Sequence, residues 1–166
     1  MIDAAYVQRM ARYNRWQNEN LYTVADALAD GERRRDRGAF FGSIQGTLNH
    51  LLWGDRIWMH RFAGWPKPSG GIKESPALVP DWSDLKRERG QSDMAIIAWA
   101  DGLDPDWIKG DMTWFSGAIN REVSKPRWQL VTHFFNHQTH HRGQVHAMLT
   151  QAGGKPHDTD LFVMPE

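Results

Sequence analysis

The chain has 166 residues, with 20 lysines and arginines balancing 20 aspartates and glutamates, eight histidines and no cysteine. This length suits one domain with its own core, and the lack of cysteine excludes disulfides, thiolate-held metal clusters and a cysteine nucleophile. Zero net charge argues against a general nucleic-acid-binding module, and the longest apolar run, residues 94–100, is too short to span a membrane. We therefore expect a cytoplasmic protein with no nucleic-acid or membrane partner.

Two helices are predicted in the first part of the chain, where apolar residues recur every three or four positions. The first covers residues 4–29 behind Asp3, whose carboxylate can cap the first turn. The second follows Ser43, a similar cap, and ends at Gly64. The proline- and glycine-rich stretch 65–80 is interpreted as a surface loop that could form the rim or lid of a site.

The rest of the chain predicts two more helices separated by a hairpin. The third helix covers about residues 82–100, with Ser83 as its N-cap, and the glycine-punctuated stretch 102–125 favours two short extended segments around a turn. Pro126 opens the fourth helix, which the glycine pair 153–154 ends. The expected fold is all-α: a four-helix bundle forming a single domain over residues 1–166, with a short β-hairpin between helices three and four.

Five of the eight histidines lie in the fourth predicted helix, between His133 and His146. His137 and His141 are four residues apart, so they share one face and can bind one metal ion. No glutamate stands between them, which argues against a zincin-type peptidase. His133 lies one turn upstream on the same stripe, His140 lies to one side, and His146 lies on the opposite side of the helix.

A third ligand is expected from the second helix, where His50 is surrounded by apolar positions. An imidazole pointing into the bundle there can meet His137 and His141. Three nitrogen ligands leave a divalent metal an open position, as in catalytic sites. Each histidine also has a plainer interpretation, because single core histidines are usually hydrogen-bonded and histidine pairs are common on helix surfaces. Their clustering favours the metal site.

Other residues near these histidines have structural interpretations. Gly143, inside the fourth helix, indicates either a close helix crossing or a helix that simply tolerates the cost of a glycine. Gln144 falls on the ligand face, either as a hydrogen-bond partner of a ligand or as a buried amide. Asp55 and Arg142 point away from the metal face, and we expect them to pair with other helices. The arginine-rich run 33–37 is interpreted as a solvated connection.

Three blocks of the sequence form a recognisable combination: Tyr13-Asn14-Arg15-Trp16 with Leu21-Tyr22, Asn49-His50-Leu51-Leu52 through Asp55 and Trp58, and Asn136-His137 through His141-Arg142-Gly143-Gln144. In these blocks the chain resembles the DinB family, the DinB/YfiT-like metalloenzymes of bacteria. The resemblance extends over nearly the whole chain. It implies a four-helix bundle, a homodimer, and a divalent metal held by His50, His137 and His141.

The resemblance implies a choice of activities. Some relatives resemble transferases or isomerases in which the metal activates a low-molecular-weight thiol cosubstrate, and others are known only as stress-inducible. We therefore expect a divalent cation, zinc or nickel first, with transfer of a thiol to an electrophilic small-molecule substrate. The alternatives are a metal-dependent hydrolase and a non-catalytic stress-inducible dimer. The latter needs a fourth protein ligand, from His133 or His140, to close the metal site.

Overall fold

Local capping fixes the ends of the long helices. In the computed structural model, which describes residues 2–117 and 119–165, Asp3 Oδ1 accepts a hydrogen bond from Tyr6 N–H at 2.8 Å. Ser43 Oγ accepts one from Gly46 N–H at 3.0 Å, and Gly64 ends that helix with a left-handed φ of 69°. The four long helices are α1 (Ala4–Asp26), α3 (Ile44–Ala63), α4 (Trp82–Asp101) and α5 (Arg127–Gln151).

The connection between α1 and α3 is more ordered than the sequence predicts. α1 ends at Asp26 rather than at residue 29, and a short helix, α2 (Asp30–Arg34), follows. The solvated interpretation of residues 33–37 is wrong for Arg33, which is only 9% exposed. Its guanidinium lies 4.7 Å from the ring centroid of Trp82 and donates hydrogen bonds to two backbone carbonyls near the end of α1.

The later boundaries differ in small ways. α4 extends to Asp101, and Pro126 is the last residue of the hairpin's second strand and the N-cap of α5 rather than its first residue. Asp81, not Ser83, is the N-cap of α4, because its carboxylate accepts a 2.8 Å hydrogen bond from Asp84 N–H. The predicted hairpin is confirmed: β1 (Asp111–Ser116) pairs antiparallel with β2 (Arg121–Pro126). Within residues 2–117 and 119–165, three short 3₁₀ helices lie between or after these elements: η1 (Ser75–Ala77), η2 (Trp107–Lys109) and η3 (Leu161–Val163).

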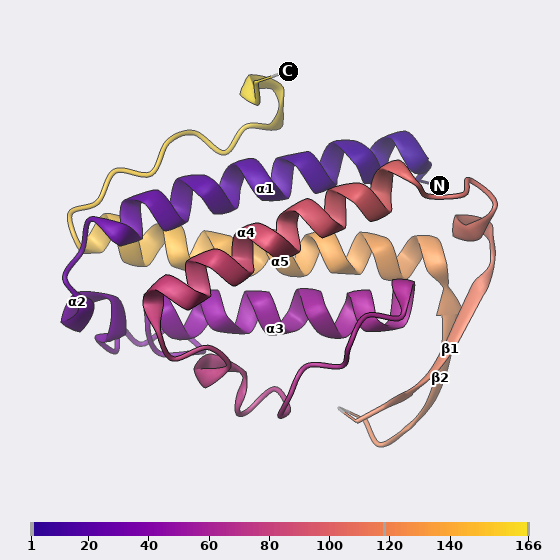
Figure 1. Ribbon diagram of the computed structural model, residues 1–166, viewed down its shortest axis with the longest axis horizontal. Helices are drawn as coiled ribbons and strands as arrows, with labels where there is room; N and C mark the ends of the chain where they lie inside the picture. The colour runs from indigo at the N-terminus through magenta and orange to yellow at the C-terminus, as the bar shows by residue number, and fades with distance from the viewer. Residues whose placement is uncertain (1, 118, 166) are drawn as a thin grey trace.

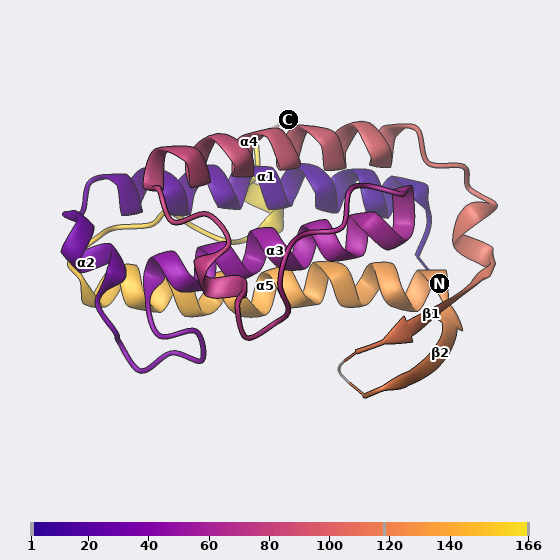
Figure 2. The same cartoon turned by 60° about the horizontal axis from the view of Figure 1, so that its bottom comes forward.

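The axes of the four long helices run roughly alongside one another. α1 packs against α4 and α5, and α3 packs against the same two helices (Figure 1). The connection before α3, the η1 segment and the hairpin all project from the side of the bundle formed by α3 and α5 (Figure 2). Any site on α3 and α5 is therefore bordered by these three segments.

The carboxyl-terminal segment runs back along α1 (Figure 1). Tyr13 Oη donates a 2.5 Å hydrogen bond to the carbonyl of Thr159, and the Gln17 amide donates one of 3.1 Å to the carbonyl of Asp158. The Trp16 and His157 rings stack with their centroids 4.9 Å apart. These contacts hold the segment on the face of α1 that turns away from α3.

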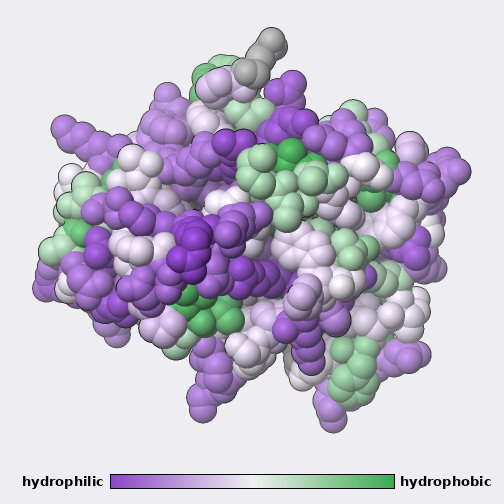
Figure 3. Space-filling view, in the orientation of Figure 1, coloured by the Kyte–Doolittle hydropathy of each residue, from purple (hydrophilic) through white to green (hydrophobic). Residues whose placement is uncertain are grey.

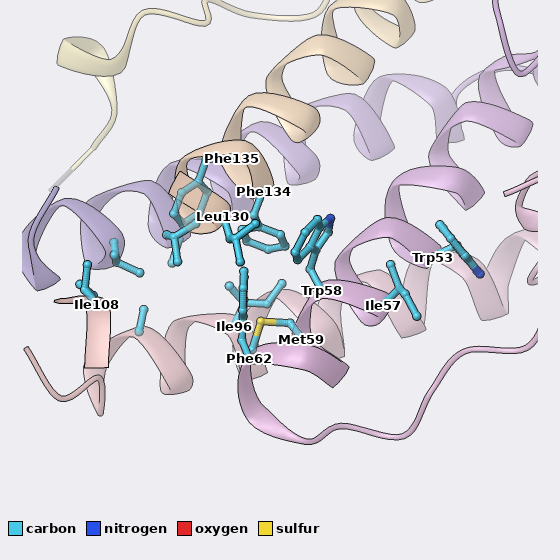
Figure 4. Packing of buried hydrophobic residues seen from close by; sticks show 14 residues of the cluster. Trp53, Ile57, Trp58, Met59, Phe62, Ile96, Ile108, Leu130, Phe134 and Phe135 are labelled. Atoms are coloured by element: carbon cyan, nitrogen blue, oxygen red, sulfur yellow. The ribbon is translucent and has the colours of Figure 1, made fainter. Parts of the chain in front are cut away.

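The core consists of two apolar clusters at opposite ends of the bundle. One contains the buried aromatic rings shown in Figure 4, where Trp58 of α3 lies beside Phe134 of α5. The other is mainly aliphatic and includes Leu21, Leu52 and Leu149. The exposed surface in Figure 3 is largely hydrophilic over the helices, with hydrophobic residues in separate patches. Among the described residues, no helix is long and apolar enough to cross a membrane.

A layer of buried polar side chains separates the two clusters, with members from all four long helices. Arg89 of α4 forms ion pairs with Asp55 of α3 at 2.6 Å and with Asp93 at 2.8 Å, and all three side chains are less than 5% exposed. Arg142 of α5 donates a 2.5 Å hydrogen bond to Asn14 of α1. The expectation that Asp55 and Arg142 pair with other helices is confirmed. Because unpaired buried charges are costly, the layer favours one helix register.

Candidate metal centre

Helices α3 and α5 bring His50, His137 and His141 together between the two helices. One ring nitrogen from each residue lies within 4.8 Å of the other two. Nε2 of His50 and Nε2 of His137 are 3.1 Å apart. His50 is 3% exposed and His141 is 7% exposed, while His137 is half-buried, so the site is only partly open to water.

Ser75 sets the orientation and tautomer of His50. Its Oγ lies 2.8 Å from Nδ1 of His50 and donates its own proton to the carbonyl of Ile72 at 2.6 Å. Because that proton is already used, Ser75 accepts the hydrogen bond and Nδ1 of His50 carries the hydrogen. The lone pair of His50 is therefore on Nε2, which faces the other two histidines.

Gln144 sets the orientation and tautomer of His141 in the same way. Its Oε1 is 2.8 Å from Nδ1 of His141, and because an amide oxygen can only accept, Nδ1 is the donor. This leaves the lone pair of His141 on Nε2. The amide nitrogen of Gln144 lies 3.3 Å from Nε2 of His140. Of the two interpretations of Gln144, the structure supports the hydrogen-bond partner, because the side chain is half-buried rather than enclosed.

His137 is accommodated by a glycine on the facing helix. A β-carbon at Gly54 would lie 2.9 Å from Cε1 and 3.4 Å from Nδ1 of the His137 ring, so only glycine allows the ring to pack directly on the α3 backbone. The close crossing predicted at Gly143 is wrong, because a β-carbon there would meet nothing within 4 Å. The close approach lies instead at Gly54, on the face of α3 that carries His50.

Burial keeps the imidazoles neutral. Loss of hydration, together with the smaller effect of the nearby imidazoles, lowers the pKa of His50 and of His137 to about 3. Burial also lowers the pKa of His141, against the opposing effect of its hydrogen bond to Gln144. A histidine must be neutral to bind a metal, so the site is prepared for a cation at neutral pH.

An aromatic wall covers one side of the three histidines. The Phe41 ring stacks on His50 with centroids 3.7 Å apart and lies 5.3 Å from the ring of His141. Phe40 packs edge-on against Phe41 at 4.8 Å and is 79% exposed. Both belong to the turn before α3, where Gly38 and Gly42 each adopt a φ of 74°. This turn places apolar surface between the histidines and solvent.

The donor set suits a divalent metal. Nitrogens that share one ion at about 2.0–2.1 Å lie roughly 3 Å apart, close to the separation of the two Nε2 atoms above. Imidazole nitrogens are ligands that zinc and nickel accept. The three predicted residues thus fit a divalent cation.

His133, one of the two histidines suspected as a fourth ligand, instead packs against Trp58 with ring centroids 5.2 Å apart. His146 is half-buried on another face of α5, and neither it nor His140 joins the group.

Comparison with known proteins agrees with this fold. The sequence model of the DinB family matches residues 1–166. The chain belongs to the DinB family. It is 26% identical over 173 residues to Protein DinB of Bacillus subtilis (strain 168), covering 98% of this chain and 95% of that protein. The crystal structure of a DinB-like protein from Bacillus cereus superposes with a TM-score of 0.63 at 16% identity, covering 86% of this chain and 90% of the other, which supports the shared fold.

The sequence of this DinB-family protein predicts that the three histidines meet, but it does not predict Ser75 and Gly54, which help to hold them. Ser75 lies 25 positions from His50 in a loop, and no periodic pattern connects the two. Gly54 could have been found, because a glycine one helical turn after His50 on the same face indicates a close approach by a facing helix.

Proposed function

We propose that this DinB-family protein holds a divalent cation on His50, His137 and His141 and transfers a low-molecular-weight thiol to an electrophilic small molecule. The observation that carries the proposal is the convergence of three imidazole nitrogens, two of them with a hydrogen-bond acceptor behind the ring. Such acceptors fix ligand orientation and raise ligand basicity in metal sites.

The chain contains no cysteine, so a thiolate must come from a cosubstrate. A divalent cation on the three histidines would hold a coordinating thiol as its thiolate at neutral pH. With only three protein ligands, a position stays open for that thiol. Zinc and nickel are the cations we expect first.

The protein's own residues supply orientation and shielding in this scheme. Ser75 and Gln144 hold the Nδ1–H groups of His50 and His141, so both rings keep Nε2 turned inward. Phe41 covers the histidines on one side and limits the approach of water. A poorly hydrated thiolate is a stronger nucleophile, so this shielding favours thiol transfer over hydrolysis.

The test uses cobalt(II) in place of the native metal. Titrating the cobalt-loaded protein with 2-mercaptoethanol should produce a sulfur-to-cobalt charge-transfer band in the near ultraviolet. The loaded protein should then conjugate the thiol to 1-chloro-2,4-dinitrobenzene. Both signals should be lost in a His137→Ala, His141→Ala variant and kept in His146→Ala. A loaded protein that shows no band, or that turns over an ester equally well without thiol, would contradict the proposal.

A further inference from the structure

Arg61, on the last turns of α3, has an unusual environment. Seven arginines in the described ranges 2–117 and 119–165 are buried or half-buried, and six of them form an ion pair or donate a hydrogen bond: Arg33, Arg37, Arg56, Arg89, Arg127 and Arg142. Arg61 is the exception within those ranges. A half-buried guanidinium with neither kind of partner keeps its N–H groups available to an anion.

Two tryptophans hold this guanidinium in place. Its carbon lies 4.5 Å from the ring centroid of Trp58 on α3 and 5.5 Å from that of Trp114 on β1. The two tryptophan rings themselves meet edge to face at 5.8 Å. Burial lowers the pKa of Arg61, but an arginine stays charged at neutral pH. Stacking on the rings fixes the plane of the guanidinium while leaving its N–H groups free to bind a ligand.

The Arg61 cluster is continuous with the histidine site. Arg61 follows His50 by 11 residues, about three helical turns, so the two lie on the same face of α3 to within about 20°. On the facing helix, the His133 ring lies 5.2 Å from Trp58 and 6.0 Å from His137, between centroids. The rings of His137, His133 and Trp58 therefore pack in a row, and the guanidinium of Arg61 lies on the last of them.

The hairpin adds positive charge to the same region. In its register Trp114 pairs with Val123, Ser116 with Arg121 and Met112 with Lys125, so these six side chains share one face. The acidic residues Asp111 and Glu122 belong to the other face. The hairpin lies at the end of the bundle beside α3 and α5 (Figure 2). In a protein with zero net charge, this concentration of cations is local.

We propose that the guanidinium of Arg61, held in place by Trp58 and Trp114, binds the carboxylate of a small molecule whose apolar body lies on the half-buried ring of Trp114. The carboxylate pairs with the free guanidinium, and Arg121 and Lys125 attract it from solution. The carboxylate subsite itself does not depend on a bound metal.

The test uses metal-free protein and two probes of the same shape, 4-phenylbutyrate and neutral 4-phenylbutyramide. Binding is followed by the tryptophan indole signals in ¹H–¹⁵N spectra, which report on Trp58 and Trp114 directly. The carboxylate should bind about tenfold more tightly than the amide, as expected for one charge-assisted pair. Arg61→Gln should remove this preference, whereas Arg9→Gln, at an exposed arginine on α1, should leave it unchanged.

Equal affinity for the two probes, a preference that persists in Arg61→Gln, or no shift of either indole signal at millimolar probe would each overturn the subsite. A His137→Ala, His141→Ala variant separates this result from the proposed function. The variant should keep the carboxylate preference of the wild type even though it cannot hold the metal. A preference that disappears in this variant would also contradict the proposal.

Discussion

Gly54 on α3 lies directly against the imidazole of His137 on α5: a β-carbon at position 54 would stand 2.9 Å from Cε1 of that ring. Gly54→Ala should therefore push the ring out of the position in which its Nε2 meets that of His50. We expect metal affinity to fall at least about tenfold, as when a ligand's supporting contacts are removed. Competition with a chromophoric chelator measures this directly.

Gly143→Ala is the matched control. It is the same substitution in the middle of a facing helix, but the added methyl group meets nothing within 4 Å. Metal affinity should not change, and stability should rise by about 0.5–1 kcal/mol because alanine is the better helix former. Equal metal affinity in the two variants would show that Gly54 does not position His137.

Ser75→Ala removes the acceptor behind His50. The Nδ1–H group would then lose its partner in a buried site, and the ring could rotate or change tautomer. Metal affinity should fall by about 10- to 100-fold while the helical circular dichroism spectrum stays the same. Ser83→Ala, at an exposed serine in the first turn of α4, should bind metal like the wild type. If the Ser75 variant also matched the wild type, the hydrogen bond would have no role in holding His50.

The sequence predicted what depends on short-range periodicity. The caps at Asp3 and Ser43 and the stop at Gly64 are local, because each contact lies within a turn of the residue that makes it. The pairing of His137 with His141 follows from helical geometry in the same way. The contacts that the sequence did not predict join segments that are far apart in the chain. The turn that places Phe41 on His50 and the loop that brings Ser75 behind it have no periodic signal.

The buried polar layer was predicted only in part, for a similar reason. Asp55 and Arg142 could be assigned to interhelical pairs because they face away from the histidines. Their partners could not be named, because Arg89 and Asn14 lie on other helices whose relative axial positions the sequence does not give. Gly143 failed as a predictor of a crossing because the cost of a glycine in a helix says nothing about which face a neighbour approaches.

Arg89→Met should destabilise the protein strongly. It leaves Asp55 and Asp93 buried without their counter-ion, a change that typically costs about 3–5 kcal/mol. Arg87→Met, on the same helix, breaks an exposed pair with Asp84 and should cost less than about 1 kcal/mol. Urea denaturation of the two variants makes the comparison. Similar losses of stability in the two variants would show that the buried ion pairs contribute no more to the free energy of unfolding than the exposed pair does.

The metal-free protein should lose stability in mild acid. In the folded state burial lowers the pKa of His50 and His137 to about 3, whereas in the unfolded chain each is near 6.5. Between these values the unfolded chain binds more protons, so this stabilisation is complete above pH 6.5 and is lost as pH falls toward 3. Each histidine contributes up to about 1.4 kcal/mol per pH unit. Urea denaturation between pH 5 and 7 should give a shallower slope for His50→Ala than for the wild type; equal slopes would contradict this assignment.

Metal content shows whether histidines on two helices share one divalent cation. Elemental analysis should compare untagged wild-type protein with His50→Ala, with the His137→Ala, His141→Ala variant, and with His146→Ala as the control on another face of α5. We expect one equivalent of divalent metal in the wild type and in the control, and none in the other two variants. Absence of metal from the wild type after reconstitution, or its retention when His50 is replaced, would contradict the shared site.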